Sequence, residues 1–280
     1  MNYKNNNFFI EKIKAENLIR KYGSPIYCYS YKRLIENINN FKNSFKSFDP
    51  LICFSVKSNY NSTILKIIKN NGLGADVVSD GELKKVLSLG FKPSKIVYSG
   101  VGKKFEEIKF AINKNILLIN VESESELKII EKLAKKSKKK VNVGLRLNPN
   151  IDAKTNTKIS TGRMQDKFGL GVSDIIKILE KFKNSYHIKI KCLSVHIGSQ
   201  ITQNKPYNNV LIKINKILAK SKFKFEYVDL GGGMGIKYNQ NTKKLNYSKL
   251  SKNILKFSKK NNCKIIFEPG RSIVGSTAVL

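Results

Sequence analysis

The chain has 280 residues, of which 41% are hydrophobic and 10% aromatic. This length and composition suit one large folded domain or two modest ones, and they exclude a disordered protein. The net charge of +33 would suit a nucleic-acid or acidic-membrane partner. However, the excess is nearly all lysine spread along the whole chain, which indicates a compositional bias shared with asparagine and isoleucine. The one dense cluster, residues 135–140, lies between a predicted helix and a predicted strand and is typical of a solvated turn.

The cysteines and the lack of long apolar segments indicate a cytoplasmic protein. None of the four cysteines (Cys28, Cys53, Cys192 and Cys263) belongs to a Cys-x-x-Cys pair, and three lie in apolar runs, as expected of buried thiols in a reducing compartment. The first 13 residues contain no apolar signal-peptide core, and no run of 18 apolar residues occurs. No His, Cys, Asp or Glu group has the spacing of a metal site, and no Gly-x-Ser-x-Gly motif is present.

The first 50 residues differ in pattern from the rest. Residues 1–25 are rich in asparagine and lysine and contain one short amphipathic stretch, residues 11–22. A strand is predicted at residues 26–30 and a helix at residues 32–45.

From residue 51 onward, short apolar runs typical of strands alternate with segments of helical periodicity. This alternation with short connections predicts parallel strands joined by crossover helices. Eight such strands predict a closed (β/α)8 barrel of the TIM type, with an open doubly wound sheet as the alternative. The predicted strands are residues 51–56, 75–78, 96–99, 117–121, 141–147, 190–196, 226–230 and 264–268, and the predicted helices are residues 63–71, 81–89, 104–113, 124–136, 174–182, 210–220 and 247–260.

Polar residues follow almost every predicted strand, and in such a barrel chemistry concentrates at the carboxyl ends of the strands. Lys57 follows the first of them. A lysine there is expected to be partly desolvated, which lowers its amine pKa and frees the lone pair for attack on a carbonyl. In so lysine-rich a chain, a lysine that merely caps a strand is the alternative.

Three further groups stand at this rim. Gly231, Gly232 and Gly233 follow the seventh strand, where backbone N–H groups can converge on a phosphate, although a flexible turn would look the same. His196 ends the sixth strand before Gly198-Ser199, where a flat ring could stack on a planar cofactor and Ser199 could donate to a phosphate. Glu268-Pro269-Gly270-Arg271 ends the eighth strand. Its carboxylate could keep a ring nitrogen protonated and its arginine could bind a carboxylate or phosphate, whereas a salt-bridged turn is the alternative.

Together these residues fit pyridoxal 5′-phosphate, and the sequence resembles the alanine-racemase-like (fold type III) pyridoxal-phosphate decarboxylases, particularly their diaminopimelate branch. The resemblance spans residues from about 25 to 280. The finer assignment depends on Gln200 and residues 233–238. The matching segments are FSVKSN (54–59), DVVSDGEL (76–83), IVYSG (96–100), NVES (120–123), LRLNP (145–149), TG (161–162), KFG (167–169), HIGSQ (196–200), DLGGGMGIKY (229–238) and EPGR (268–271).

The resemblance implies a role for each of these residues. Lys57 would bind the cofactor covalently, His196 would stack on its ring, and Glu268 would pair with the pyridine nitrogen; these three are the expected catalytic residues. Arg271 would also lie near a substrate carboxylate. The phosphate would be held by Ser199, Gly231, Gly232, Gly233 and the backbone around Pro269, Gly270 and Arg271.

The implied reaction is decarboxylation of meso-2,6-diaminopimelate to L-lysine and CO2, the last step of lysine biosynthesis, in a cytoplasmic homodimer without a nucleic-acid, membrane or metal partner. Three alternatives are a sister decarboxylase acting on ornithine, arginine or carboxynorspermidine, a non-catalytic barrel that binds pyridoxal phosphate, and a basic nucleic-acid-binding protein. The last would explain none of the rim residues.

The resemblance also predicts an organisation that this chain does not complete. Family members continue into a C-terminal β-domain that carries a catalytic cysteine and further substrate-binding residues, whereas this sequence ends within a predicted helix after the eighth strand. We therefore expect residues 1–30 to join that β-domain and residues 31–280 to form the cofactor-binding barrel. On this reading the 280-residue chain alone would be inactive.

Overall fold

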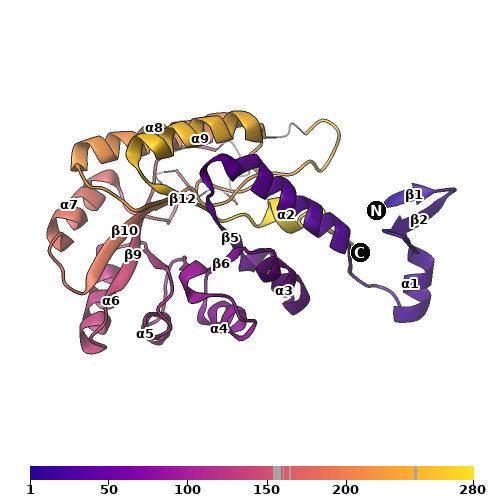
Figure 1. Cartoon of the computed structure of the whole chain (residues 1–280), viewed down its shortest axis with the longest axis horizontal. Coiled ribbons are helices and arrows are strands. Elements are labelled where there is room, and N and C mark those ends of the chain that lie inside the picture. Colours follow the sequence, from indigo (N-terminus) through magenta and orange to yellow (C-terminus); the bar gives the residue numbers. More distant parts are fainter. Residues whose placement is uncertain (154–158, 160, 164, 243–244) are drawn as a thin grey trace.

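A closed barrel of eight parallel strands forms the centre of the computed structural model, which describes residues 1–153, 159, 161–163, 165–242 and 245–280 (Figure 1). The strand order around the barrel follows the chain and closes between β12 and β5. This confirms the predicted (β/α)8 barrel and contradicts the open sheet. The strands are β5 (Leu51–Ser55), β6 (Gly74–Val77), β7 (Ile96–Tyr98), β8 (Leu118–Val121), β9 (Val141–Leu147), β10 (Ile188–Val195), β11 (Tyr227–Asp229) and β12 (Lys264–Phe267).

The barrel helices follow the predicted periodicity closely. The largest difference is at α8, which begins at Asn204 rather than at residue 210. Its first turn looks like a loop in sequence because it contains Pro206, but a proline fits the first helical turn, where backbone N–H groups have no intrahelical acceptor. The helices are α2 (Tyr31–Phe45), α3 (Ser62–Asn70), α4 (Asp80–Ser88), α5 (Phe105–Asn113), α6 (Glu124–Lys136), α7 (Val172–Phe182), α8 (Asn204–Ser221) and α9 (Tyr247–Asn261).

Two strand-to-helix turns are fixed by the same local motif. Ser79 accepts a hydrogen bond from the backbone N–H of Glu82 at 3.2 Å, and the Glu82 carboxylate accepts one from the N–H of Val78 at 2.9 Å. Ser123 and Glu126 repeat the arrangement before α6. Each serine caps a free N–H group at a helix start. Each glutamate bonds the N–H of the residue before the cap, so the motif also fixes where β6 and β8 end.

The core has two parts, one outside and one inside the barrel. Outside, α2 packs Phe41 and Phe45 onto Phe267 of β12, with ring centroids 5.7 and 4.6 Å apart, and so covers the seam where the barrel closes. The interior part is a smaller apolar cluster contributed by five strands: Cys53, Val97, Leu118, Cys192 and Ile266. Burial raises the pKa of both of these thiols well above the ordinary value, so they are packing residues.

The two chain ends differ from the prediction. Residues before the barrel form an antiparallel sheet of β1 (Asn2–Lys4), β2 (Asn7–Ile10) and β3 (Ile13–Lys14), followed by α1 (Ala15–Tyr22), so the helical pattern at residues 11–14 does not form a helix. The strand predicted at residues 26–30 is only β4 (Cys28–Tyr29).

The prediction that the sequence ends within a helix after the eighth strand is also wrong. The helix there is the single turn α10 (Arg271–Val274), and the chain continues into β13 (Ala278–Val279), which pairs with β4. The pairing is extended by a bond of 2.7 Å from the N–H of Ser30 to the carbonyl of Thr277. Both termini therefore lie on the same side of the barrel (Figure 1). Within the described ranges, none of the helices combines the length and apolarity needed to cross a membrane.

A substitution at Gly74 tests how closely the barrel wall is packed. A Cβ built there would lie 2.1 Å from the carbonyl oxygen of Lys95, whereas one at Gly81 would lie 3.8 Å from its nearest neighbour, the Ser79 hydroxyl. We expect Gly74→Ala to lower the free energy of unfolding by about 2–3 kcal/mol, because backbone must move, and Gly81→Ala to be neutral or stabilising. Urea unfolding of both variants measures the difference, and equal stabilities would contradict the packing described.

Candidate active site

A cavity of about 400 Å³ opens at the carboxyl end of the barrel. Lys57, His196, Ser199 and Glu268 line it, so four of the residues singled out in the sequence meet at one place. The other predicted residues adjoin it through the contacts described below. The rest of the lining is Val78, Ser99, Gly100, Val101, Asn120, Arg146, Ile159, Thr161, Phe168, Ser194, Val195 and Asp229.

Lys57 lies in a single 3-10 turn, Val56–Ser58, that follows β5. The turn is closed by the Ser58 hydroxyl, which donates to the carbonyl of Ser55 at 2.6 Å. The expectation that Lys57 would be partly desolvated at the end of the strand is wrong, because the turn carries it to an exposed position at the cavity mouth. Its positive charge partly offsets the burial that raises the pKa values of Asp76 and Glu268, and it adds to the burial that lowers the pKa of His196, so it acts electrostatically on the interior.

Glu268 is a buried carboxyl directly after β12, with 8% of its surface exposed. It accepts a hydrogen bond from Ser99 at 3.3 Å, across the barrel. Burial, followed by the neighbouring charge of Asp229, raises its pKa well above the ordinary value. A cation placed against this carboxyl would relieve that cost.

His196 is held against the glycine run. Its Nδ1 accepts a hydrogen bond of 3.2 Å from the backbone N–H of Gly232, and its carbonyl accepts one of 2.7 Å from Thr161. Burial and the positive charges of Lys57 and Arg146 keep its pKa well below the ordinary value. The ring is therefore a neutral, fixed plane beside the cavity.

The glycine run after β11 packs so tightly that side chains are excluded. A Cβ at Gly232 would lie 2.1 Å from the carbonyl oxygen of Glu268, and one at Gly233 would lie 2.1 Å from that of Gly198. Gly231 and Gly233 also have positive φ angles of 63° and 86°. Glycine is thus required by both space and backbone conformation, and the run joins the loops after β10 and β12.

The segment after β12 forms the third wall. Arg271 donates from Nε to the Ser199 hydroxyl at 3.3 Å and also bonds the hydroxyl of Tyr238. Pro269 accepts a hydrogen bond of 3.1 Å from the N–H of Ser55, which extends the β12–β5 pairing. A Cβ at Gly270 would lie 2.9 Å from the Cβ of Ser58, so this segment packs directly on the turn that carries Lys57.

Beneath the cavity, every barrel strand contributes one buried polar residue, which we call the polar layer. Side chains alternate along a strand, so residues two positions apart face the same side. Each of these polar residues lies either two positions beyond the apolar interior cluster or level with it, and therefore also points into the barrel. The sequence interpretation missed most of them, although a single polar residue within or just after a short apolar strand is the available signal. The polar layer consists of Ser55, Asp76, Ser99, Asn120, Arg146, Ser194, Asp229 and Glu268, each at most 8% exposed.

Hydrogen bonds connect the polar layer around the barrel. Asn120 donates to Ser99 at 3.1 Å and to Asp229 at 3.4 Å, and Ser55 donates to Asp76 at 2.8 Å. Burial raises the pKa of Asp76 to about 7 and that of Asp229 to about 6. Three carboxyls with raised pKa values therefore lie close together beneath the cavity.

Two buried cations support the same rim. Arg146 donates to Glu122 at 2.6 Å, and its guanidinium lies 4.7 Å from the ring centre of Phe168. Lys103, whose side chain is 1% exposed, places its ammonium 2.7 Å from each of three acceptors: Glu126 and the carbonyls of Gly100 and Asn120. By donating to the carbonyls of both Gly100 and Asn120, Lys103 joins the loop after β7 to the end of β8, next to Ser99.

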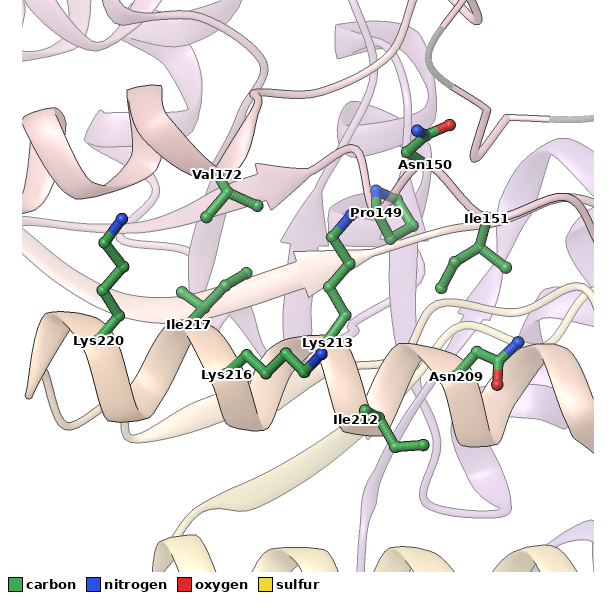
Figure 2. A pocket seen from close by; sticks show the side chains of 10 residues that line it. All are labelled: Pro149, Asn150, Ile151, Val172, Asn209, Ile212, Lys213, Lys216, Ile217 and Lys220. Carbon is green, nitrogen blue, oxygen red and sulfur yellow. The ribbon is translucent and has the colours of Figure 1, made fainter.

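A second cavity, of about 410 Å³, lies between α8 and the segment after β9 (Figure 2). Apolar side chains such as Ile217 and Val172 alternate there with Lys213, Lys216 and Lys220 of α8. None of the predicted site residues lines it, and lysines on one exposed helix face are ordinary solvated residues. The chemistry therefore belongs to the barrel mouth. In the described part of the chain, no group of three His, Cys, Asp or Glu side chains is placed to hold a metal ion.

Residues 31–275 match the family described as "Pyridoxal-dependent decarboxylase, pyridoxal binding domain". The chain belongs to this family. It is 36% identical to the diaminopimelate decarboxylase of Aquifex aeolicus over 286 residues, which covers all of this chain and 67% of the relative.

Solved structures agree. A diaminopimelate decarboxylase from Helicobacter pylori, complexed with L-lysine, superposes with a TM-score of 0.90 at 37% identity, covering 94% of this chain and 68% of that one. An arginine decarboxylase of Paramecium bursaria Chlorella virus superposes with a TM-score of 0.76 at 21% identity, covering 94% and 69%, and so shares the fold.

The family's cofactor is pyridoxal 5′-phosphate, and the geometry fits it. The buried Glu268 carboxyl, with its raised pKa, faces the cavity, and among the described residues no cation hydrogen-bonds it. The glycine run has no side chains of its own to occupy the mouth, and Ser199 with Arg271 supplies donors of the kind that a phosphate needs. A primary amine, Lys57, lies at the same mouth.

The pH dependence of stability tests the raised pKa of Asp76 in the polar layer. The pKa of Asp76 is about 7 in the fold against an ordinary 3.8. Between these values the folded state holds a proton that the unfolded state has lost, so stability falls as the pH rises from about 4 to about 7. Asp76→Asn should remove up to about 1.4 kcal/mol of that fall per pH unit.

Urea unfolding at pH 5 and pH 7.5 measures this slope. Asp80→Asn is the matched control, because Asp80 is outside the polar layer and its pKa is lowered by a hydrogen bond from Lys84. Identical slopes for wild type and Asp76→Asn would contradict a buried, proton-holding carboxyl at this position.

Proposed function

We propose that the barrel catalyses the pyridoxal-phosphate-dependent decarboxylation of meso-2,6-diaminopimelate to L-lysine and CO2. The observation that carries the proposal is the meeting of Lys57, His196 and Glu268, from the ends of three strands, around one cavity of about 400 Å³. The bound cofactor supplies the electron sink for the pair of electrons left when the C–CO2 bond breaks.

Each of the three residues has a distinct task in this proposal. Lys57 is the amine that holds the cofactor's aldehyde carbon and exchanges with the amine of the substrate. His196, neutral and fixed by Gly232, offers its ring as a flat support for the cofactor. Glu268 holds the ring nitrogen in its protonated form, since a positive charge there offsets the cost of burying this carboxyl.

The opposite end of the cofactor would be held by the three loops after β10, β11 and β12. Ser199 and the N–H of Gly233 would be neutral donors for the phosphate, and Arg271 would supply charge. Gly231 and Gly232, whose N–H groups donate to Asp229 and His196, would let the loop approach the phosphate closely. Pro269 and Gly270 position Arg271 against the turn that carries Lys57. Arg271 also stands near enough to the mouth, through Ser199, to meet a substrate carboxylate.

The substrate assignment follows the relatives. The Helicobacter pylori enzyme at 37% identity is complexed with L-lysine, the product of the proposed reaction. A sister substrate such as ornithine or arginine is the second candidate. A barrel that binds the cofactor without catalysis is less consistent with a buried carboxyl, Glu268, facing the cavity, because that group favours an electron-sink reaction.

The organisation of the whole enzyme is part of the proposal. The chain spans about two thirds of the length of its diaminopimelate decarboxylase relatives. We infer that residues 1–30, whose β4 pairs with β13, pack with the part of the relatives that lies beyond this chain, and that residues 31–280 form the cofactor-binding domain. A cytoplasmic homodimer is the proposed working form.

The proposal is tested by CO2 release from meso-diaminopimelate, ornithine and arginine, measured side by side with pyridoxal phosphate and the protein expressed from its full reading frame. We expect release from diaminopimelate, reduced by more than about 1,000-fold in Lys57→Ala, because the covalent link to the cofactor is lost. Lys84→Ala removes an exposed lysine and serves as the control. Release from ornithine or arginine alone would move the protein to a sister activity, and no release from any would reject the decarboxylase.

A further inference from the structure

Gln200 uses both ends of its side-chain amide on one residue of a neighbouring loop. Its Nε2 donates to the carbonyl of Ile236 at 2.7 Å, and its Oε1 accepts from the N–H of the same residue at 3.2 Å. Gln200 follows Ser199 after β10, whereas Ile236 follows the glycine run after β11. The side chain is therefore a clamp between two loops that come from adjacent strands.

The backbones of these loops are joined along the same line. The N–H of Ile201 donates to Gly233 at 2.8 Å, and the N–H of Gly235 donates to Ile201 at 2.9 Å. A Cβ at Gly235 would lie 3.2 Å from the Cδ of Gln200, so the amide passes directly over a residue without a side chain. The two loops run parallel and form one layer, with Ser199 and Gly233 at the same end and the Gln200–Ile236 contact farther along it.

Gln200 adopts a conformation that a glutamine rarely takes. Its φ angle is +63°, in the left-handed region that L-residues other than glycine, asparagine and aspartate seldom occupy. Such backbone strain persists only where surrounding contacts hold it. The two bonds to Ile236 are contacts of this kind, and they fix the direction in which the preceding residue, Ser199, presents its hydroxyl.

We infer that Gln200 is a positioning residue for the cofactor's phosphate: it holds Ser199 and the glycine run in one rigid anion-binding unit. Its amide is already used on Ile236, so it acts through its neighbours. Arg271, bonded to Ser199, adds the third loop to this unit. The inference rests on the proposed binding of pyridoxal phosphate at this mouth.

The test compares two aldehydes that differ only in the phosphate. Gln200→Met keeps the length of the side chain and removes both hydrogen bonds. We expect it to weaken pyridoxal 5′-phosphate binding to the cofactor-free protein by about tenfold or more, the equivalent of two ordinary hydrogen bonds, and to leave pyridoxal binding within about twofold of wild type. Absorbance titration gives both dissociation constants.

Gln203→Met is the matched control, because Gln203 precedes α8 and its side chain makes no capping bond; it should bind both aldehydes as wild type does. The phosphorus NMR shift of the bound cofactor gives an independent signal and should change only in the Gln200 variant. If Gln200→Met does not fold, Gln200→Asn, which stays neutral but shortens the amide side chain that bonds Ile236, is measured against the same ratio.

Equal weakening of both aldehydes would show a general structural role and overturn the inference, as would unchanged binding of both. A wild-type protein that binds neither aldehyde would reject the proposed cofactor site itself, which is a different failure. Loss confined to the phosphorylated aldehyde supports the inference.

Discussion

The constraint on which the rest of this structure depends is a layer of polar side chains buried inside a closed sheet. Eight polar side chains, three of them carboxyls, lie out of water above an apolar cluster, and a buried polar group is costly unless it is paired. Pairing is incomplete: one oxygen of Asp76, the Asn120 carbonyl oxygen and the Ser194 hydroxyl have no hydrogen-bond partner among the described residues. A barrel built only for stability would fill this level with apolar side chains, as most such barrels do. The unfavourable burial of polar groups is therefore confined to the level directly beneath the cavity.

The loops around the mouth are rigid for reasons that are local. Hydrogen bonds from the backbone to Glu82 and Glu126 fix the ends of β6 and β8, and the buried ammonium of Lys103 joins the loop after β7 to β8. On the other side, glycines let three loops pack backbone to backbone. A buried charge pair adds little net stability but is costly to break. The main effect of the Lys103–Glu126 pair is therefore to hold the neighbouring loops in one arrangement, and its contribution to the free energy of unfolding is small. The result is a preformed mouth, which reduces the ordering that a ligand must induce.

The sequence predicted the barrel well because its signal is periodic and repeated eight times. It failed at the ends, where β1, β3 and β4 are only two or three residues long and partly exposed, too short for any period to show. At the site, residues that follow strands were identified because parallel strands end on one rim. Asp76 and Asn120 were missed because one polar residue in a short apolar strand does not reveal which way it faces. The exposure of Lys57 and the clamp of Gln200 depend on loop conformation, which residue types alone do not specify.

The large positive charge of the chain has little bearing on the site. Charges on the exposed surface are screened within about 10 Å in ordinary salt, whereas buried groups are screened far less. The electrostatics of the mouth are therefore set by a few neighbours: Lys57 and Arg146 against Asp76, Asp229 and Glu268. Among many lysines, Lys57 is distinguished by the carboxyls that its charge reaches. What distinguishes Lys57 is therefore its position at the cavity mouth above three buried carboxyls, and not the composition of the surface around it.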